Sequence, residues 1–132
     1  MNERILVVDD RVPHVDLGAG DPRAALLARA LRRVRPDAEV VWAAVSADGA
    51  DRYGPPLEAI GIEVRAGEVE RTITDRTGAF GAVIVSRPDN HRRVRDLLDR
   101  RQPQAVRIYD AESLFHRRSR READVTGTLE AE

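Results

Sequence analysis

The chain has 132 residues, 42% of them hydrophobic and 34% charged, which is enough apolar material for one core and argues against global disorder. It contains no cysteine, which excludes disulfides, thiolate metal ligands and a cysteine nucleophile, and favours a reducing, cytoplasmic location. The formal net charge is −1, since 22 basic residues are balanced by 23 acidic ones. Acidic residues are also interleaved among the arginines, which argues against a nucleic-acid partner.

The first predicted element is a buried strand. Residues 5–8 are a continuous apolar run that ends in Asp9 and Asp10, which is typical of a parallel strand buried on both faces with acids at its carboxyl end. A glycine-bearing loop follows, and Asp21 and Pro22 then supply the N-cap and the first-turn proline of a helix. The expected buried face of this helix has helical spacing: Leu27, Ala30, Leu31 and Val34.

Apolar runs and polar breaks alternate along the rest of the chain. The apolar runs predict further strands at residues 40–45, 62–64, 82–85 and 105–109. The segments between them predict helices at residues 55–60, at residues 68–77 and from Asp89 or Asn90 to Pro103, and a last helix at residues 112–123. Gly61 is expected to end the helix at residues 55–60.

This alternation predicts an α/β fold, a Rossmann-like, mainly parallel five-stranded sheet with helices on both faces. We expect residues 1–123 to form one domain and residues 124–132 to be a frayed, acidic C-terminal end. The N-terminal apolar run is too short for a signal peptide or a membrane span, so no targeting segment is expected. Contact between arginine-rich helices and an anionic membrane surface stays open.

Ligands of such a sheet bind beyond the carboxyl ends of its strands. The residues expected at this edge are Asp9, Asp10, Ser46 and the segments 86–90 and 110–113. Two acids after a first strand are also found in phosphorelay receivers, but their chemistry needs a lysine after the fifth strand, and this chain has no lysine. A degenerate receiver remains an alternative. Strand order separates the two, because the first strand lies between the second and fourth in a Rossmann sheet and between the second and third in a receiver.

The loop after the first strand contains Gly18, Ala19 and Gly20 and leads into the helix at Asp21. Glycines permit close backbone approach and a helix N-terminus attracts anions, so a phosphate could bind here. The pattern is not the dinucleotide-binding one, because Arg23 stands where its third glycine would be. The alternative is a flexible loop ahead of a capped helix.

Other polar residues have competing interpretations. His14 lies among acids, but the spacing matches no metal site, so we expect a solvated loop histidine and no metal. Arg87 offers a donor fork to a phosphate or carboxylate, or pairs with a neighbouring acid. Asp110 and Glu112 could accept sugar hydroxyls or act as bases, whereas Ser113 is expected to cap a helix.

Taken in order, several segments resemble the N-terminal region of bacterial GT-B glycosyltransferases of the retaining, cell-surface-polysaccharide type. They are residues 5–14 (ILVVDDRVPH), 16–20 (DLGAG), 61–64 (GIEV), 83–88 (VIVSRP) and 108–118 (IYDAESLFHRR). The resemblance covers most of the chain and depends on the order and spacing of these segments. One departure is Glu112-Ser113-Leu114, where the family has an aspartate-leucine pair.

In enzymes of this family two Rossmann-like domains face each other, the first binding the acceptor and the second the nucleotide sugar, without an obligatory metal. The resemblance implies a set of substrate-binding residues: Gly18, Ala19, Gly20, Asp21, Arg87, Asp110 and Glu112. It implies no cofactor beyond the nucleotide sugar, which is the donor substrate, and its partners are a sugar acceptor and a missing donor-binding domain or partner chain. We therefore expect an acceptor-side domain without turnover alone; the alternative is a non-enzymatic binding or regulatory module of receiver-like topology.

Overall fold

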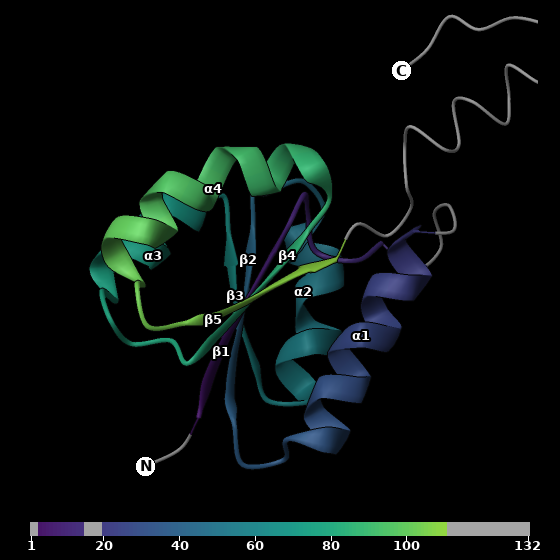
Figure 1. Ribbon diagram of the computed structural model, residues 1–132. Coiled ribbons are helices and arrows are strands. Elements are labelled where there is room, and N and C mark those ends of the chain that lie inside the picture. Colours follow the sequence, from purple (N-terminus) through teal and green to yellow (C-terminus); the bar gives the residue numbers. More distant parts are fainter. Residues whose placement is uncertain (1–2, 15–19, 111–132) are drawn as a thin grey trace, which may run out of the picture.

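The computed structural model describes residues 3–14 and 20–110, and within these ranges five strands alternate with four helices (Figure 1). The elements are β1 (Arg4–Asp9), α1 (Gly20–Val34), β2 (Glu39–Ala44), α2 (Ala50–Ala59), β3 (Ile62–Ala66), α3 (Val69–Asp75), β4 (Ala82–Ser86), α4 (Pro88–Arg101) and β5 (Val106–Asp110). The helix expected at residues 112–123 and the frayed end expected at residues 124–132 lie outside the described residues. Within them, no helix has the length and apolar character that a membrane span requires.

All strands of the sheet are parallel, and their order is β3-β2-β1-β4-β5. β1 therefore lies between β2 and β4, which is the Rossmann arrangement. The receiver-like topology considered as an alternative is wrong for this chain. The connection through α3 crosses from β3 past β2 and β1, so that β4 pairs with the far side of β1.

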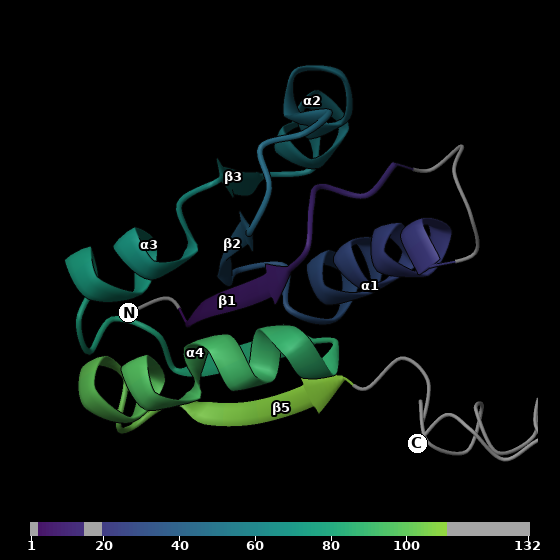
Figure 2. The same cartoon turned by 90° about the horizontal axis from the view of Figure 1, so that it is seen from above.

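Helices cover both faces of the sheet, and each face has its own apolar cluster. In Figure 2, α1 and α2 lie on one side of the sheet and α3 on the other. Along β1, Ile5 and Val7 pack on the side of α1 and α2, whereas Leu6 and Val8 pack on the side of α3 and α4. This double burial explains why β1 has a continuous apolar run rather than an alternating one.

The buried side of α1 differs from the one predicted. Ala24 and Ala28 are 8% and 0% exposed, while Val34 is 65% exposed and Ala30 is also exposed. Leu27 and Leu31 are partly buried against the same cluster, so the inward face has helical spacing but starts at Ala24. Because Ala24, Leu27, Ala28 and Leu31 form the inward face, Ala30 and Val34 lie on the outward side of the helix.

α2 begins at Ala50, five residues before the predicted start, and contains Pro55 and Pro56. The helix continues through both prolines, although each of them removes one backbone donor inside it. Gly61 follows the helix with φ of 82°, which confirms its predicted role at the helix end.

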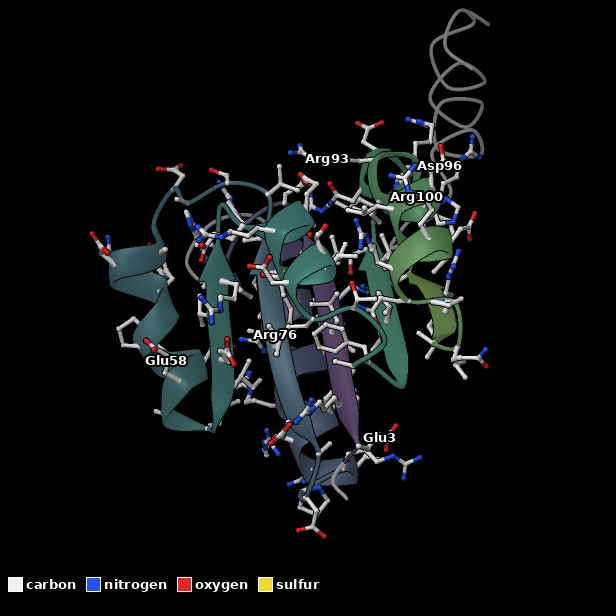
Figure 3. The ribbon with its side chains drawn as sticks, turned by 90° about the vertical axis from the view of Figure 1, so that its left-hand side faces the viewer. Glu3, Glu58, Arg76, Arg93, Asp96 and Arg100 are labelled. Carbon is white, nitrogen blue, oxygen red and sulfur yellow. The ribbon has the colours of Figure 1, made fainter. Side chains whose placement is uncertain are left out.

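α4 begins with Pro88 as its first helical residue, so the predicted caps Asp89 and Asn90 are wrong. The C-cap residue Gln102, which follows α4, is 1% exposed and joins α4 to α3. The Gln102 side-chain amide donates to the carbonyls of Ile73 at 3.0 Å and Arg76 at 2.6 Å, and its oxygen accepts from the amide of Phe80 at 3.2 Å. The outer surface of α4 is charged, with Arg93, Asp96 and Arg100 along it (Figure 3).

Candidate functional site at the carboxyl edge of the sheet

The candidate site lies where the strand order changes direction. The chain leaves β1 through α1 on one face and leaves β4 through α4 on the other, so the two connections diverge at the carboxyl ends of these neighbouring strands. Such a switch point is the usual ligand position in open parallel sheets. The side chains here come from Asp9 and Asp10 after β1 and from Ser86 and Arg87 after β4.

Arg87 bridges the two aspartates. Its Nε lies 3.2 Å from Asp9 Oδ1 and its Nη1 lies 3.1 Å from Asp10 Oδ2. The Asp9 side chain is 5% exposed, whereas that of Asp10 is 47% exposed and that of Arg87 is 30% exposed. Of the two interpretations of Arg87, pairing with neighbouring acids is therefore the one found. The three charges sum to −1, and part of the Asp10 carboxylate faces solvent.

Asn90 holds Asp10 in position. This side chain is 3% exposed, and its Nδ2 donates to Asp10 Oδ1 at 2.8 Å and to the Ser86 carbonyl at 3.0 Å. The backbone amide of Asp10 donates to Asp9 Oδ1 at 2.7 Å. Predicted as a helix cap, Asn90 instead fixes the position of a carboxylate at the switch point.

The backbone of Arg87 is strained. Its φ is 77° and its ψ is 141°, and it has the only positive φ among the non-glycine residues described. Such a conformation costs on the order of 1–3 kcal/mol and is found most often at functional sites. The two ion pairs of the side chain and a 2.9 Å bond from the Arg87 amide to the Asp110 carbonyl hold the residue there.

Asp110 is paired with an arginine from the first turn of α1. Arg23 Nη1 donates to Asp110 Oδ2 at 2.6 Å and Nη2 donates to Oδ1 at 2.8 Å, a two-bond contact between planar groups. The Asp110 side chain is 16% exposed. In the sequence, Arg23 stands out only as a departure from a glycine motif. Because the helix after β1 must begin at the carboxyl edge, its first-turn position could have indicated the contact.

His14 is buried, so the expectation of a solvated loop histidine is wrong. It is 4% exposed, its ring stacks on that of Tyr53 with centroids 4.3 Å apart, and its Nε2 lies 3.0 Å from the carbonyl of Asp48. The loop after β1 folds back onto the start of α2, where Gly49 leaves room for the imidazole. His14 thereby fastens the end of residues 10–14 to the start of α2.

The remaining predicted site residues lie outside the described residues or in secondary structure and turns at the same edge. Gly18, Ala19 and Glu112 lie outside the described residues, and Gly20 and Asp21 form the start of α1. Ser46 accepts a bond from the Asp48 amide at 3.0 Å and belongs to a turn. In the part of the chain that the structure describes, no three His, Asp or Glu side chains are grouped as a metal site.

A hollow of about 720 Å³ lies at the opposite, amino end of the sheet. Two arginines of its lining are engaged in structural contacts: Arg4 Nε donates to Glu39 at 2.6 Å, and Arg32 donates to the carbonyl of Ala38 at 2.8 Å. No non-glycine residue of its lining has a positive φ, and it lies away from the switch point. We therefore place the candidate site at the carboxyl edge.

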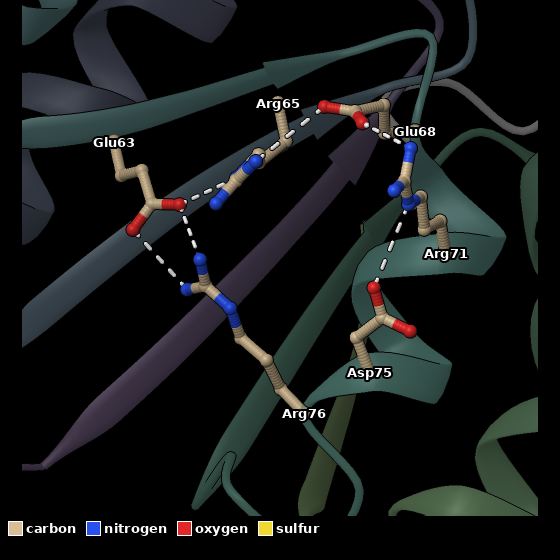
Figure 4. A network of polar contacts seen from close by, with 6 residues as sticks. All are labelled: Glu63, Arg65, Glu68, Arg71, Asp75 and Arg76. Atoms are coloured by element: carbon tan, nitrogen blue, oxygen red, sulfur yellow. Dashed lines mark hydrogen bonds and ion pairs between the residues drawn. The ribbon is translucent and has the colours of Figure 1, made fainter.

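A second charged cluster lies on β3 and α3 (Figure 4). Glu63 accepts bonds from Arg65 at 2.6 Å and from Arg76 at 3.1 Å. The hydrogen bond from Arg76 lowers the pKa of Glu63, and burial partly opposes this effect. This cluster lies on an edge strand and has no strained backbone, so we interpret it as structural.

No protein family, curated protein or solved structure matches the chain.

Proposed function

We propose that the chain is the acceptor-side domain of a GT-B-type glycosyltransferase, which transfers a sugar from a nucleotide sugar to a glycan or a lipid-linked acceptor. The observation that carries the proposal is the Rossmann strand order, with Asp10 and Arg87 at its switch point. The absence of receiver-like strand order removes the main support for the regulatory alternative.

The chemistry of the edge suits a hydroxyl-bearing ligand. Carboxylates accept hydrogen bonds from sugar hydroxyls, and the half-exposed carboxylate of Asp10 is already oriented by Asn90 and Arg87. A site whose polar groups are fixed in advance loses less entropy on binding. Beside it, the Arg87 and Arg23 guanidinium groups supply donors that a phosphate could share.

The proposed role is limited to one wall of a cleft. Glycosyl transfer requires the donor and acceptor to be held in reacting geometry, and stabilisation of charge on the leaving nucleotide needs groups on the donor side. We therefore assign acceptor binding to this chain and donor binding to a second domain or partner chain. No metal or cofactor is part of the proposal.

An NMR titration of the full chain tests this assignment. A uridine diphosphate sugar, simple glycosides and inorganic phosphate are added separately. We expect glycosides to shift the amides of Asp10, Arg87 and Asp110, and to leave Gly61 and Gly78 at the amino edge unshifted.

Matched variants sharpen the titration. Asp10→Asn should weaken glycoside binding about tenfold, because a charge-assisted hydrogen bond is replaced by a neutral one. Asp96→Asn on the outer side of α4, where the side chain is 82% exposed, should bind like the unmodified chain. A folded chain whose carboxyl-edge amides stay unshifted by every sugar would contradict the proposal.

A further inference from the structure

Two aromatic rings lie together at the carboxyl edge, outside the ion pairs described above. Tyr109 is the penultimate residue of β5, and its ring contacts the ring of His91, with centroids 4.9 Å apart and planes inclined at 43°. His91 is the fourth residue of α4, which begins at this edge. We call Tyr109 and His91 the aromatic pair.

Tyr109 is the one exposed Trp, Phe or Tyr side chain in the part of the chain that the structure describes, with 45% exposure. The other three are buried or half-buried: Trp42, Phe80 and Tyr53. The backbone of Tyr109 pairs with that of Val85, which packs beneath α4, so the Tyr109 ring lies on the α4 side of the sheet. The ring is therefore supported by His91 and still open to a ligand.

The N-terminal turn of α4 connects the aromatic pair with the candidate site. Asn90 donates a hydrogen bond to Asp10, and the next residue, His91, contacts Tyr109. Because β4 lies between β1 and β5, Asp10 and Tyr109 are separated by about two strand spacings, roughly 10 Å. This distance exceeds the width of one pyranose ring. A saccharide that contacts both positions therefore contains at least two rings.

We propose that the aromatic pair is a second acceptor subsite, at which the Tyr109 ring packs against the C–H face of a sugar. The acceptor is then an oligosaccharide of two or more rings. One ring is held at Asp10 through its hydroxyl groups, and the next stacks on Tyr109. This inference rests on the proposed function and names the class of its acceptor.

The two subsites suit different parts of a sugar. Hydroxyl groups donate hydrogen bonds, and the carboxylate of Asp10 accepts them. One face of a pyranose ring presents mainly C–H groups, which an aromatic face removes from water and attracts through its partial negative charge. The phenolic hydroxyl of Tyr109 keeps one end of the ring compatible with water. A sugar can thus cover the exposed part of this ring without leaving a polar group unpaired.

Titrations of the full chain with methyl glycosides of glucose, galactose and mannose, and with the matching disaccharide glycosides, test the proposal. We expect a disaccharide to bind about tenfold more tightly than its monosaccharide, the upper range for one aromatic contact. Tyr109→Ala should reduce this ratio to about one, and Tyr109→Phe should preserve it. Val106→Ala is the matched control and should also preserve it, because Val106 is 64% exposed on the opposite side of β5.

The outcomes separate this inference from the proposed function. Equal affinities for monosaccharides and disaccharides, with the amides of Asp10 and Arg87 still shifting, would overturn the second subsite and leave the acceptor assignment standing. A ratio that Tyr109→Ala does not change would overturn it as well. Loss of every sugar response in a folded chain would contradict both proposals. If Tyr109→Ala does not fold, nuclear Overhauser contacts between the Tyr109 ring and sugar C–H protons in the unmodified chain decide, and their absence would refute the subsite.

Discussion

Two residues at the carboxyl edge, Gly49 and Arg87, have positive φ for different reasons. At Gly49 the conformation is inexpensive, and the missing side chain leaves space for His14. At Arg87 a bulky residue holds a strained conformation because its guanidinium binds two aspartates. The first position serves packing, and the second places a charged group at the switch point.

Gly49→Ala should destabilise the fold by about 2–4 kcal/mol. Alanine at this position would have to keep a positive φ, which costs about 1–2 kcal/mol. Its Cβ would also lie 2.2 Å from His14 Nε2, which is a steric clash. Gly78→Ala is the matched control, since its φ is 70° and no atom lies near its Cβ position. Urea denaturation measures both; equal losses would show that contact with His14 contributes nothing.

At the scale of elements, α3 and α4 are joined by one buried amide. Gln102 satisfies the carbonyl of Ile73 and the amide of Phe80, and it adds a second bond to the carbonyl of Arg76, which also accepts from the Ala79 amide. α3 is short and contains β-branched threonine, so its stability depends on this contact and on the burial of Val69 and Ile73. Sequence periodicity indicated the two apolar residues but not the polar connection.

Gln102→Leu should lower the free energy of unfolding by about 2–4 kcal/mol, because it leaves buried backbone groups without hydrogen bonds. Gln104→Leu, at an exposed position two residues away, should change it by less than about 0.5 kcal/mol. Thermal unfolding followed by circular dichroism makes the comparison. Similar midpoints for the two variants would argue against a structural role for the Gln102 amide.

Glu63 makes the stability of β3 and α3 dependent on pH. Its pKa is lowered in the folded chain, first by the hydrogen bond from Arg76. The stabilisation is thus fully present above the unfolded pKa of about 4.3 and is lost as pH falls through the lowered folded value. Because the group is partly exposed, the effect at neutral pH should not exceed about 1 kcal/mol.

Glu63→Gln should remove this part of the acid dependence, so the difference in stability from the unmodified chain should shrink as pH falls below about 4. Urea denaturation between neutral pH and about pH 3 would measure it. Asp96→Asn serves as the control. A difference that stays constant over this range would contradict the role assigned to the carboxylate.

At the scale of the whole molecule, the strands and helices were predictable and their contacts were not. Every predicted strand within residues 3–14 and 20–110 is present, because buried parallel strands have distinctive apolar runs. The sequence also indicated that Asp9, Asp10, Arg87 and Asp110 gather at one edge, since parallel strands end together. The inward face of α1 differed from the predicted one, because two alanines, which carry little periodicity signal, are buried there in place of Ala30 and Val34.

Local sequence thus determined a Rossmann-like alternation of elements and the edge at which polar groups collect. Only the tertiary structure decided the strand order, because it depends on which strands the α3 connection passes. It also decided which charges pair: Arg87 with Asp9 and Asp10, and Arg23 with Asp110. These partners are separated by many residues along the chain, and no local pattern specifies contacts that arise when the sheet is assembled.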